Sequence, residues 1–307
     1  MTNVVLQTSD HGLGAEFDIA ERGQFKTAMK RFLRHRLAMG SLSLLFLIVV
    51  IAFLGSAITP KHISYEDLSP TISGGPTNIH WFGTDNIGHD LFAQIQRGTQ
   101  KSVQIAMMVA FFSTAFGVFV GALAGFYRGL LDSLLSRITD LVQTLPILVL
   151  LLVLLRRMQD QRTNSLLISL IIAGVIWPST ARVVRGLVLS LREKEFVEAA
   201  RALGASDRRI IVRHLLPNCV GPIIVSATLT VAVAILLEAS LSFLGFGVSA
   251  PEVSLGRLVD LGRDTSTTKP WLFYFPGLVL IIICLCVNFI GDGLRDALDP
   301  QQDRIRA

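Results

Sequence analysis

The chain has 307 residues, of which 51% are hydrophobic and only 17% are charged. A soluble protein of this length carries about 25% charged residues, so the composition and a mean hydropathy of +0.56 indicate lipid as the main solvent. The net charge of +5 does not indicate nucleic acid, because the basic residues lie in short blocks beside apolar runs. Residues 1–24 lack an early apolar core, so we expect a cytoplasmic tail and no cleaved signal peptide.

Six stretches without Asp, Glu, Lys or Arg locate the expected membrane spans, since about 20 helical residues cross the hydrocarbon core. They lie between Arg36 and Lys61, Lys101 and Arg128, Asp140 and Arg156, Arg162 and Arg182, Arg213 and Glu238, and Lys269 and Asp292. The third has only 15 residues, although Ile138 and Thr139 can extend it. Pro146 and Pro178 are candidates for kinks in the third and fourth spans. We therefore predict an all-α, polytopic membrane protein with six transmembrane helices.

The distribution of basic residues predicts the orientation. Six spans place both termini on one side, and the positive-inside rule puts the basic segments 26–36 and 182–213 in the cytoplasm. Arg156, Arg157 and Arg162 conflict with this scheme, because it places them outside. The long, turn-rich outer segment 60–98 is either a docking loop for a soluble delivery protein or a simple connector.

A charged segment between the fourth and fifth spans predicts a helical hairpin. Phe196, Ala199, Ala200 and Leu203 share one apolar face of the first helix, and Gly204 can end that helix in a left-handed conformation. Ser206 or Asp207 can cap a second short helix. That helix is expected to turn Ile210 and Ile211 inward and Arg208, Arg209 and Arg213 outward, with Pro217 as its stop. By itself the pattern is also typical of an amphipathic loop on lipid headgroups.

This segment also resembles a known family signature, and its position between the fourth and fifth expected spans supports the resemblance. Glu198-Ala199-Ala200, Gly204 and Leu216-Pro217 resemble the EAA signature of ABC importer permeases. The family usually has isoleucine where this chain has His214. The sequence of residues 213–218 instead resembles the peptide-permease branch. Similarity to the C-type subunits of oligopeptide and dipeptide permeases extends from about residue 25 to Pro300. It is carried by residues 80–85, 88–90, 241–247, 276–277 and 288–300.

Two positions depart from that branch. Arginine is more usual at His89, and a Trp-Gly pair that is common before the last span is Leu255-Gly256 here. A role of that tryptophan is therefore not carried over.

The resemblance implies a type I ABC importer permease fold whose cytoplasmic coupling helices dock in a groove of an ATPase subunit. The residues implied in coupling are Glu198, Ala199, Ala200, Gly204, Arg208, Arg209, Leu216 and Pro217. The implied partners are a homologous second permease in a heterodimer, two ABC ATPase subunits and an extracytoplasmic substrate-binding protein, at a bacterial inner membrane. The chain itself is expected to bind no cofactor, with ATP and Mg in the ATPase subunits. Peptides are the expected cargo, and nickel complexes or glutathione are alternatives within the same branch.

Other residues in the spans allow more than one interpretation. Gly117, Gly121 and Gly125 form a tandem GxxxG pattern, which favours close helix packing either within the chain or against a second permease subunit. Glu238 is costly in lipid, so it either lines or gates the pathway, anchors a helix near the outer interface, or pairs with a basic residue of a partner.

No catalytic constellation or metal site is evident in the sequence. There is no GxxxxGK[ST] phosphate loop and no HExxH motif, and the three cysteines occur as small apolar residues. An intramembrane enzyme would need a reactive pair, and a secondary transporter would usually show inverted repeats and midplane ionisable residues. The resulting scheme is a cytoplasmic tail (1–36), a first span (37–59), an outer segment (60–98), a permease core (99–298, coupling helices about 192–216) and a cytoplasmic tail (299–307).

Overall fold

The computed structural model describes residues 28–58, 74–157, 164–248 and 252–298. Within these ranges the regular secondary structure is helical, apart from an isolated β-bridge between Thr84 and Asp90. The predicted all-α class is therefore confirmed. Most of the two expected tails, residues 1–27 and 299–307, lies outside the described residues.

Five helical segments of the described chain are long and apolar enough to cross a membrane. They are α2 (Arg36–Ile58), α3 (Leu91–Tyr127), α6 (Ser165–Leu191), the continuous run of α8 (Asp207–Ile210), η1 (Ile211–Leu215) and α9 (Leu216–Phe243), and α11 (Trp271–Leu298). The first predicted span, 37–59, agrees with α2 to within one residue. The outer segment predicted as 60–98 ends earlier, because Asp90 caps α3 and residues 91–98 form its first turns.

The third predicted span is not a straight helix. α4 (Gly129–Thr144) and α5 (Ile147–Arg157) meet at an angle of 89°, so they form either one broken span or a re-entrant turn. The break has a local cause, because Leu145 is extended (ψ 138°), as the residue before a proline prefers, and Pro146 follows it. Arg156 and Arg157 lie in the last turn of α5, which is turned by 89° from α4 and does not continue its direction.

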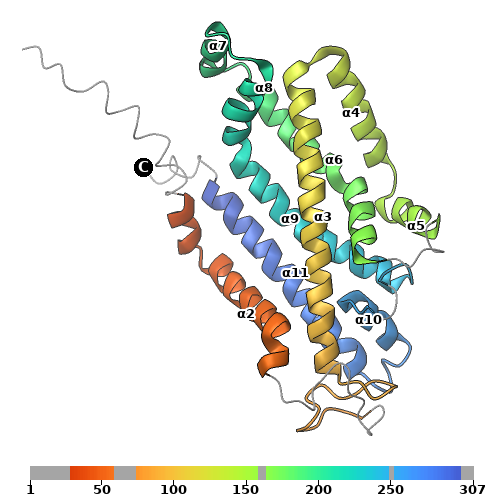
Figure 1. The fold of residues 1–307 in the computed structure, drawn as a ribbon. Helices are drawn as coiled ribbons and strands as arrows, with labels where there is room; N and C mark the ends of the chain where they lie inside the picture. Colours follow the sequence, from red (N-terminus) through yellow and green to blue (C-terminus); the bar gives the residue numbers. More distant parts are fainter. Residues whose placement is uncertain (1–27, 59–73, 158–163, 249–251, 299–307) are drawn as a thin grey trace, which may run out of the picture.

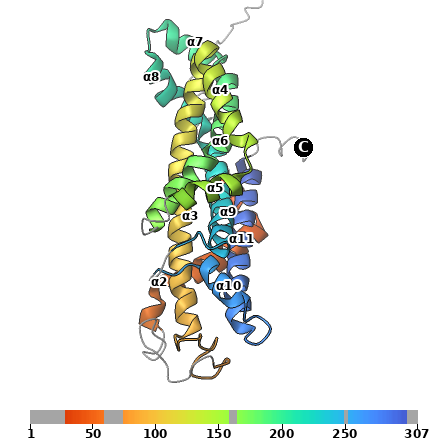
Figure 2. The same cartoon turned by 90° about the vertical axis from the view of Figure 1, so that its right-hand side faces the viewer.

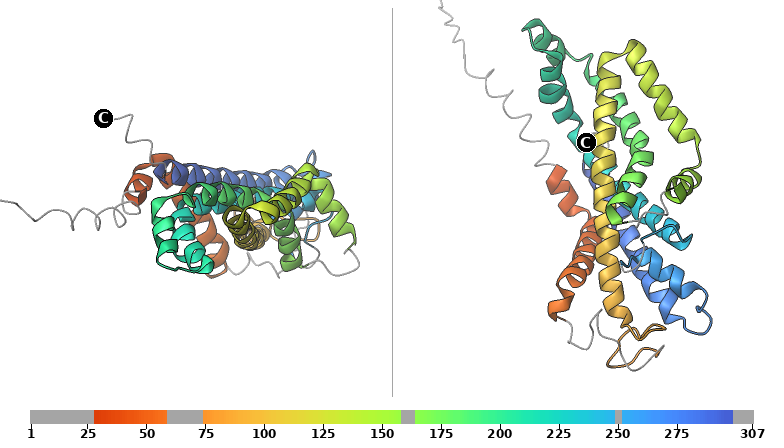
Figure 3. Two further views of the ribbon diagram at one scale, coloured as in Figure 1. Left: turned by 90° about the horizontal axis from the view of Figure 1, so that it is seen from above. Right: turned by 45° about the vertical axis from the view of Figure 1, so that its right-hand side comes forward.

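The elements form an elongated bundle around α3 (Figure 1). The short helices α7 (Glu195–Ala202) and α8 lie at one end, and the segment that leads into α3 lies at the other. We call the first the hairpin end and the second, after the orientation expected from the sequence, the outer end. The side view shows the same elongation along α3 (Figure 2). Seen from above, α11 runs along one edge of the bundle, where α2 packs against it (Figure 3).

The most extensive helix contact joins α3 to α6 and depends on three glycines. A Cβ atom at Gly121 would lie 2.4 Å from the carbonyl oxygen of Ala181, and one at Gly117 would lie 2.8 Å from Cβ of Thr180. Gly125 is equally close to Val188. These glycines therefore pack within the chain, which is the intramolecular of the two alternatives. Pro178 lies inside α6, which stays one continuous helix.

Candidate coupling hairpin and outer-end loop

The hairpin between α6 and α9 is built around one left-handed glycine. Gly204 has φ +79°, as its position in the sequence predicts. The amide of Gly204 donates to the carbonyl of Arg201, and the amide of Ala205 donates to that of Ala200, both at 3.0 Å. This pair of bonds is a Schellman motif, which ends α7 and reverses the chain. Ser206 occupies the N-cap position of α8, but its side chain makes no capping hydrogen bond.

The inner side of the hairpin is fastened to the bundle. Val197 and Ala200 of α7 and Ile210 of α8 are buried in one cluster with Phe126 of α3 and Val188 of α6. The predicted inward direction of Ile210 and Ile211 is confirmed. Arg192, just before α7, donates to the carbonyl of Phe126 and lies over its ring, with the guanidinium carbon 5.6 Å from the centroid.

The apolar face expected for α7 is mostly not the buried one. Of its four residues only Ala200 is buried, whereas Phe196, Ala199 and Leu203 are exposed, and the Leu203 side chain is 89% exposed. Glu198, Arg208 and Arg209 of the same hairpin are exposed as well. The hairpin end therefore presents an apolar surface with charged neighbours, formed by Phe196, Ala199 and Leu203.

The second arm of the hairpin does not stop at Pro217. α8, η1 and α9 follow one another without a break, and Pro217 lies in the first turn of α9. The five residues before α9 form a π-helical turn. A proline has no N–H for the carbonyl four residues back, and a wider turn before it allows the helix to continue. The predicted proline stop is thus wrong, and the second arm of the hairpin continues directly into α9.

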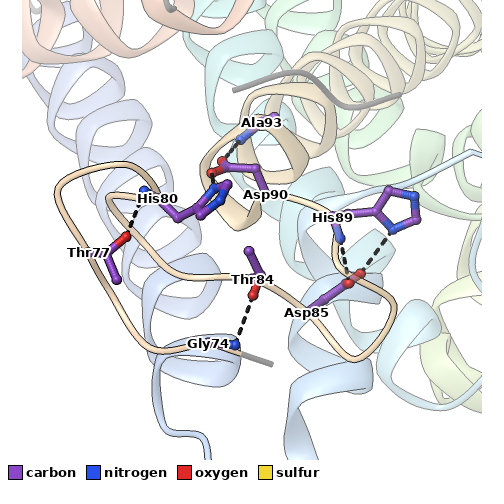
Figure 4. Close-up of polar contacts among 8 residues, drawn as sticks. All are labelled: Gly74, Thr77, His80, Thr84, Asp85, His89, Asp90 and Ala93. Carbon is purple, nitrogen blue, oxygen red and sulfur yellow. Dashed lines mark hydrogen bonds and ion pairs between the residues drawn. The ribbon is translucent and has the colours of Figure 1, made fainter. Parts of the chain in front are cut away.

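At the outer end, hydrogen bonds fold residues 74–90 into a compact loop (Figure 4). Asp90 accepts from the amide of Ala93 at 3.0 Å and lies 2.8 Å from Nδ1 of His80, so the cap of α3 also holds the loop. Thr84 bonds Gly74 through both backbone and side chain.

Asp85 forms the centre of the turn at 85–89. One carboxylate oxygen accepts from the amides of Ile87, Gly88 and His89 at 2.8–2.9 Å, and the other accepts from Gln94 at 2.7 Å. Burial raises the pKa of Asp85, but the bonds from Ile87, His89 and Gln94 outweigh it and leave the pKa below its ordinary value. The loop is therefore a defined surface, with Phe82 stacked on Phe275 of α11 at 4.4 Å between ring centroids.

Glu238 lies in α9 near the outer end, and its side chain is fully buried. Within the chain, its hydrogen-bond partners are the hydroxyls of Ser102 and Ser242. Sequence reasoning missed these serines, together with Ser254. Serines are common in membrane helices, and no spacing links residues from three separate elements.

Comparisons with known proteins agree with this architecture. A family model described as the inner membrane component of binding-protein-dependent transport systems matches residues 117–304, and a model of the N-terminal transmembrane domain of oligopeptide transport permease C matches residues 23–76. The chain belongs to this family of binding-protein-dependent ABC transporter permeases. Such a component works with an ATPase and a binding protein, and the chain is a multi-pass membrane protein.

Relatives match over almost the whole chain. The oligopeptide transport system permease protein OppC of Mycobacterium tuberculosis (strain H37Rv) is 43% identical over 279 residues, which cover 91% of this chain and 95% of that protein. OppC of Escherichia coli (strain K12) is 37% identical over 289 residues, covering 93% and 94%. An inward-facing structure of the MetNI methionine ABC transporter superposes with a TM-score of 0.54 at 21% identity, covering 66% of this chain and 96% of that one. This last likeness concerns the fold alone.

Proposed function

We propose that this chain is one of two homologous permease subunits of an ATP-driven importer for peptides, and that the hairpin at 195–217 docks on an ABC ATPase subunit. The observation that carries the docking proposal is the hairpin itself. It is fixed to the bundle on one side by Val197 and Ile210, and it presents Leu203 outward on the other. Together with Phe196 and Ala199 it forms an exposed apolar surface on a charged hairpin, which is suited to being covered by a protein partner.

The geometry supports a direct route for force. Because α8, η1 and α9 form one continuous helical run, a displacement of the hairpin moves the fifth span with it. ATP and Mg would bind in the two ATPase subunits, which would prefer different hairpin positions in their open and closed states. The difference in binding free energy between those states would drive alternating access.

The proposed orientation places the hairpin end and both termini in the cytoplasm of a bacterial cell, with residues 74–90 outside. The basic residues at 182–213 support it. The outer loop and α10 (Leu255–Arg263) would then face the substrate-binding protein.

Peptides are the proposed cargo, because the relatives that match over nine-tenths of the chain carry oligopeptide transport in their names. Nickel complexes and glutathione remain the alternatives within this branch. Uptake assays in vesicles that contain the second permease, the ATPases and the binding protein would separate these cargoes.

The docking test uses Leu203→Ala in the complete complex, with Leu261→Ala as a matched control. Both leucines are exposed, but Leu203 directly follows α7 in the hairpin, whereas Leu261 lies on α10 at the outer end. Burying a leucine stabilises by about 1.5–3 kcal/mol, so Leu203→Ala should weaken ATPase association by roughly tenfold or more. Leu261→Ala should leave ATPase association unchanged.

Two further substitutions probe the same surface. Glu198→Ala removes an exposed charge of α7, and Gly204→Ala strains the left-handed turn by about 1–2 kcal/mol. Both should lower ATP-driven uptake. Gly204→Asn, whose side chain tolerates this conformation, should retain more uptake than Gly204→Ala. Normal uptake in the Leu203, Glu198 and Gly204 variants together would refute the docking proposal.

An autonomous secondary transporter makes the opposite prediction. It would move its cargo in vesicles that contain no ATPase subunit. Uptake that requires both co-purified ATPase subunits and ATP is the expected result.

A further inference from the structure

Glu238 is the centre of a polar network inside the bundle. Its Oε2 accepts from Ser102 on α3 at 3.1 Å, and its Oε1 accepts from Ser242, one turn later on α9, at 2.7 Å. The Glu238 side chain is 0% exposed, so water does not reach its carboxylate. The serine hydroxyls donate the hydrogen bonds that water would donate to an exposed carboxylate.

Hydroxyls of Ser102 and of a third serine, Ser254, also bond the first turn of α10. Ser102 accepts from the amide of Leu255 at 3.2 Å, and Ser254, the N-cap residue of α10, accepts from the amide of Arg257 at 3.2 Å. Ser254 lies 3.3 Å from the hydroxyl of Ser242. Glu238 is therefore joined through serines to the amino end of a helix, where a negative charge is favourable.

α10 fits closely against three spans, and each contact uses a glycine. A Cβ atom at Gly98 of α3 would lie 3.2 Å from the amide nitrogen of Leu255, and one at Gly256 would lie 2.5 Å from Cα of Ala239 on α9. Gly262 meets Leu272 at the start of α11 in the same way. The ion pair of Lys101 with Glu252, at 2.6 Å, connects the segment before α10 to α3 as well.

The position of Glu238 along α9 connects this network to the hairpin end. α9 begins at Leu216, directly after the hairpin, and Glu238 lies 22 residues later. At 1.5 Å per residue, the helix carries the carboxylate about 33 Å from the start of α9. One helix thus has the hairpin at one end and the bonded α10 at the other.

We infer that Glu238 is a positioning residue that clamps α10 to the outer end of α9, so that α10 and the hairpin move together. A binding protein that contacts the outer end would then act on the ATPase through α10, Glu238 and α9. The inference deepens the proposed function and rests on it. Glu238 acts here through its bonds to Ser102 and Ser242, and its side chain is buried inside the bundle.

The test compares two buried serines of α3. Ser102 bonds Glu238 and the amide of Leu255, whereas Ser113 bonds only the carbonyl of Ala110 in its own helix. Ser102→Ala and Ser113→Ala therefore remove the same atom at similar burial. Glu238→Gln, which keeps the shape and loses one acceptor, is the third variant.

Two measurements are made on each variant. Hydrogen exchange on the purified chain follows the amides of Leu255 and Arg257, and needs no ATPase. Ser102→Ala should speed exchange there by about tenfold, the equivalent of one net hydrogen bond, and Ser113→Ala should not change it. The second measurement is the ATPase rate of the complete complex, with and without peptide-loaded binding protein.

The expected result is that Ser102→Ala and Glu238→Gln keep the basal ATPase rate and ATPase association but lose most of the stimulation by binding protein. Unchanged exchange in Ser102→Ala would overturn the clamp. Faster exchange with normal stimulation would reduce Glu238 to a structural role and also overturn the inference. Failure of the docking proposal is distinguishable, because it shows as normal ATPase association in Leu203→Ala, a variant that leaves the Glu238 network intact.

Discussion

At the scale of single residues, absent side chains decide how closely α3 approaches α6. Gly121 faces the backbone of Ala181, where a Cβ would lie 2.4 Å from an oxygen, whereas a Cβ at Gly186 on α6 would meet nothing within 4 Å. Gly121→Ala should therefore destabilise the chain by about 1–3 kcal/mol through overpacking. Gly186→Ala should be neutral or stabilising by up to about 1 kcal/mol, because alanine favours a helix.

Thermal unfolding of the purified variants in detergent measures both effects. Equal stability of Gly121→Ala and Gly186→Ala would contradict the close helix contact.

Residue-level prediction succeeded where the cause is local. The left-handed Gly204 follows from the end of an Ala-rich helix, and the inward Ile210 follows from charged neighbours on the other side. The buried face of α7 was not predictable in this way. Val197 is inside and Leu203 outside because the bundle lies on the Val197 side, and helical periodicity does not tell on which side of a helix the bundle lies.

At the scale of elements, α4 is fastened to α6 by two ion pairs of different quality. Asp132 binds Arg185 through two bonds, Nε–Oδ1 at 2.6 Å and Nη2–Oδ2 at 2.8 Å, and the Asp132 side chain is 17% exposed. Asp140 binds Arg182 through one bond at 2.9 Å and is 65% exposed. Asp132→Asn should cost about 1.5–3 kcal/mol, as expected for bidentate bonds to a charged group. Asp140→Asn should cost about 1 kcal/mol or less.

Denaturant unfolding of the two variants compares the contributions of the two ion pairs to the free energy of unfolding. Arg185→Lys is added because it keeps the positive charge but cannot make the two parallel bonds to Asp132. A larger loss in Asp140→Asn than in Asp132→Asn would show that α4 is held differently.

Pro146 and Pro178 show why the path of a helix could not be predicted from the sequence alone. Pro146 follows an amphipathic helix that is pinned to α6 by Asp132 and Asp140, so α5 turns away. Pro178 is buried in the middle of α6, where packing against α3 preserves a single helix. The same residue type breaks one segment and not the other, because the neighbours of each helix decide.

At the scale of the whole molecule, the proposed orientation predicts which surfaces an impermeant thiol reagent reaches. Ile87 in the outer loop and Leu203 in the hairpin are both well exposed, and the native Cys219, Cys284 and Cys286 are buried. In cells that express the chain without the ATPase subunits, which would cover Leu203, Ile87→Cys should label in intact spheroplasts and Leu203→Cys should label only after the membrane is opened. Labelling of Leu203→Cys in intact spheroplasts would reverse the orientation.

The sequence alone determined the class of the protein, the number of apolar segments, the hairpin between the fourth and fifth spans, and the family resemblance. These properties follow from hydropathy, charge and short-range turn chemistry, which act along the chain. Only the tertiary structure decided that Gly117, Gly121 and Gly125 face α6, that the fifth span continues through Pro217 into the hairpin, and that Glu238 bonds Ser102 of α3, which also accepts from the first residue of α10. The physical reason is that each of these depends on contacts between segments far apart in the chain, and in a membrane bundle such contacts are selected by fit and hydrogen bonding, since apolar residues alone do not distinguish a neighbouring helix from lipid.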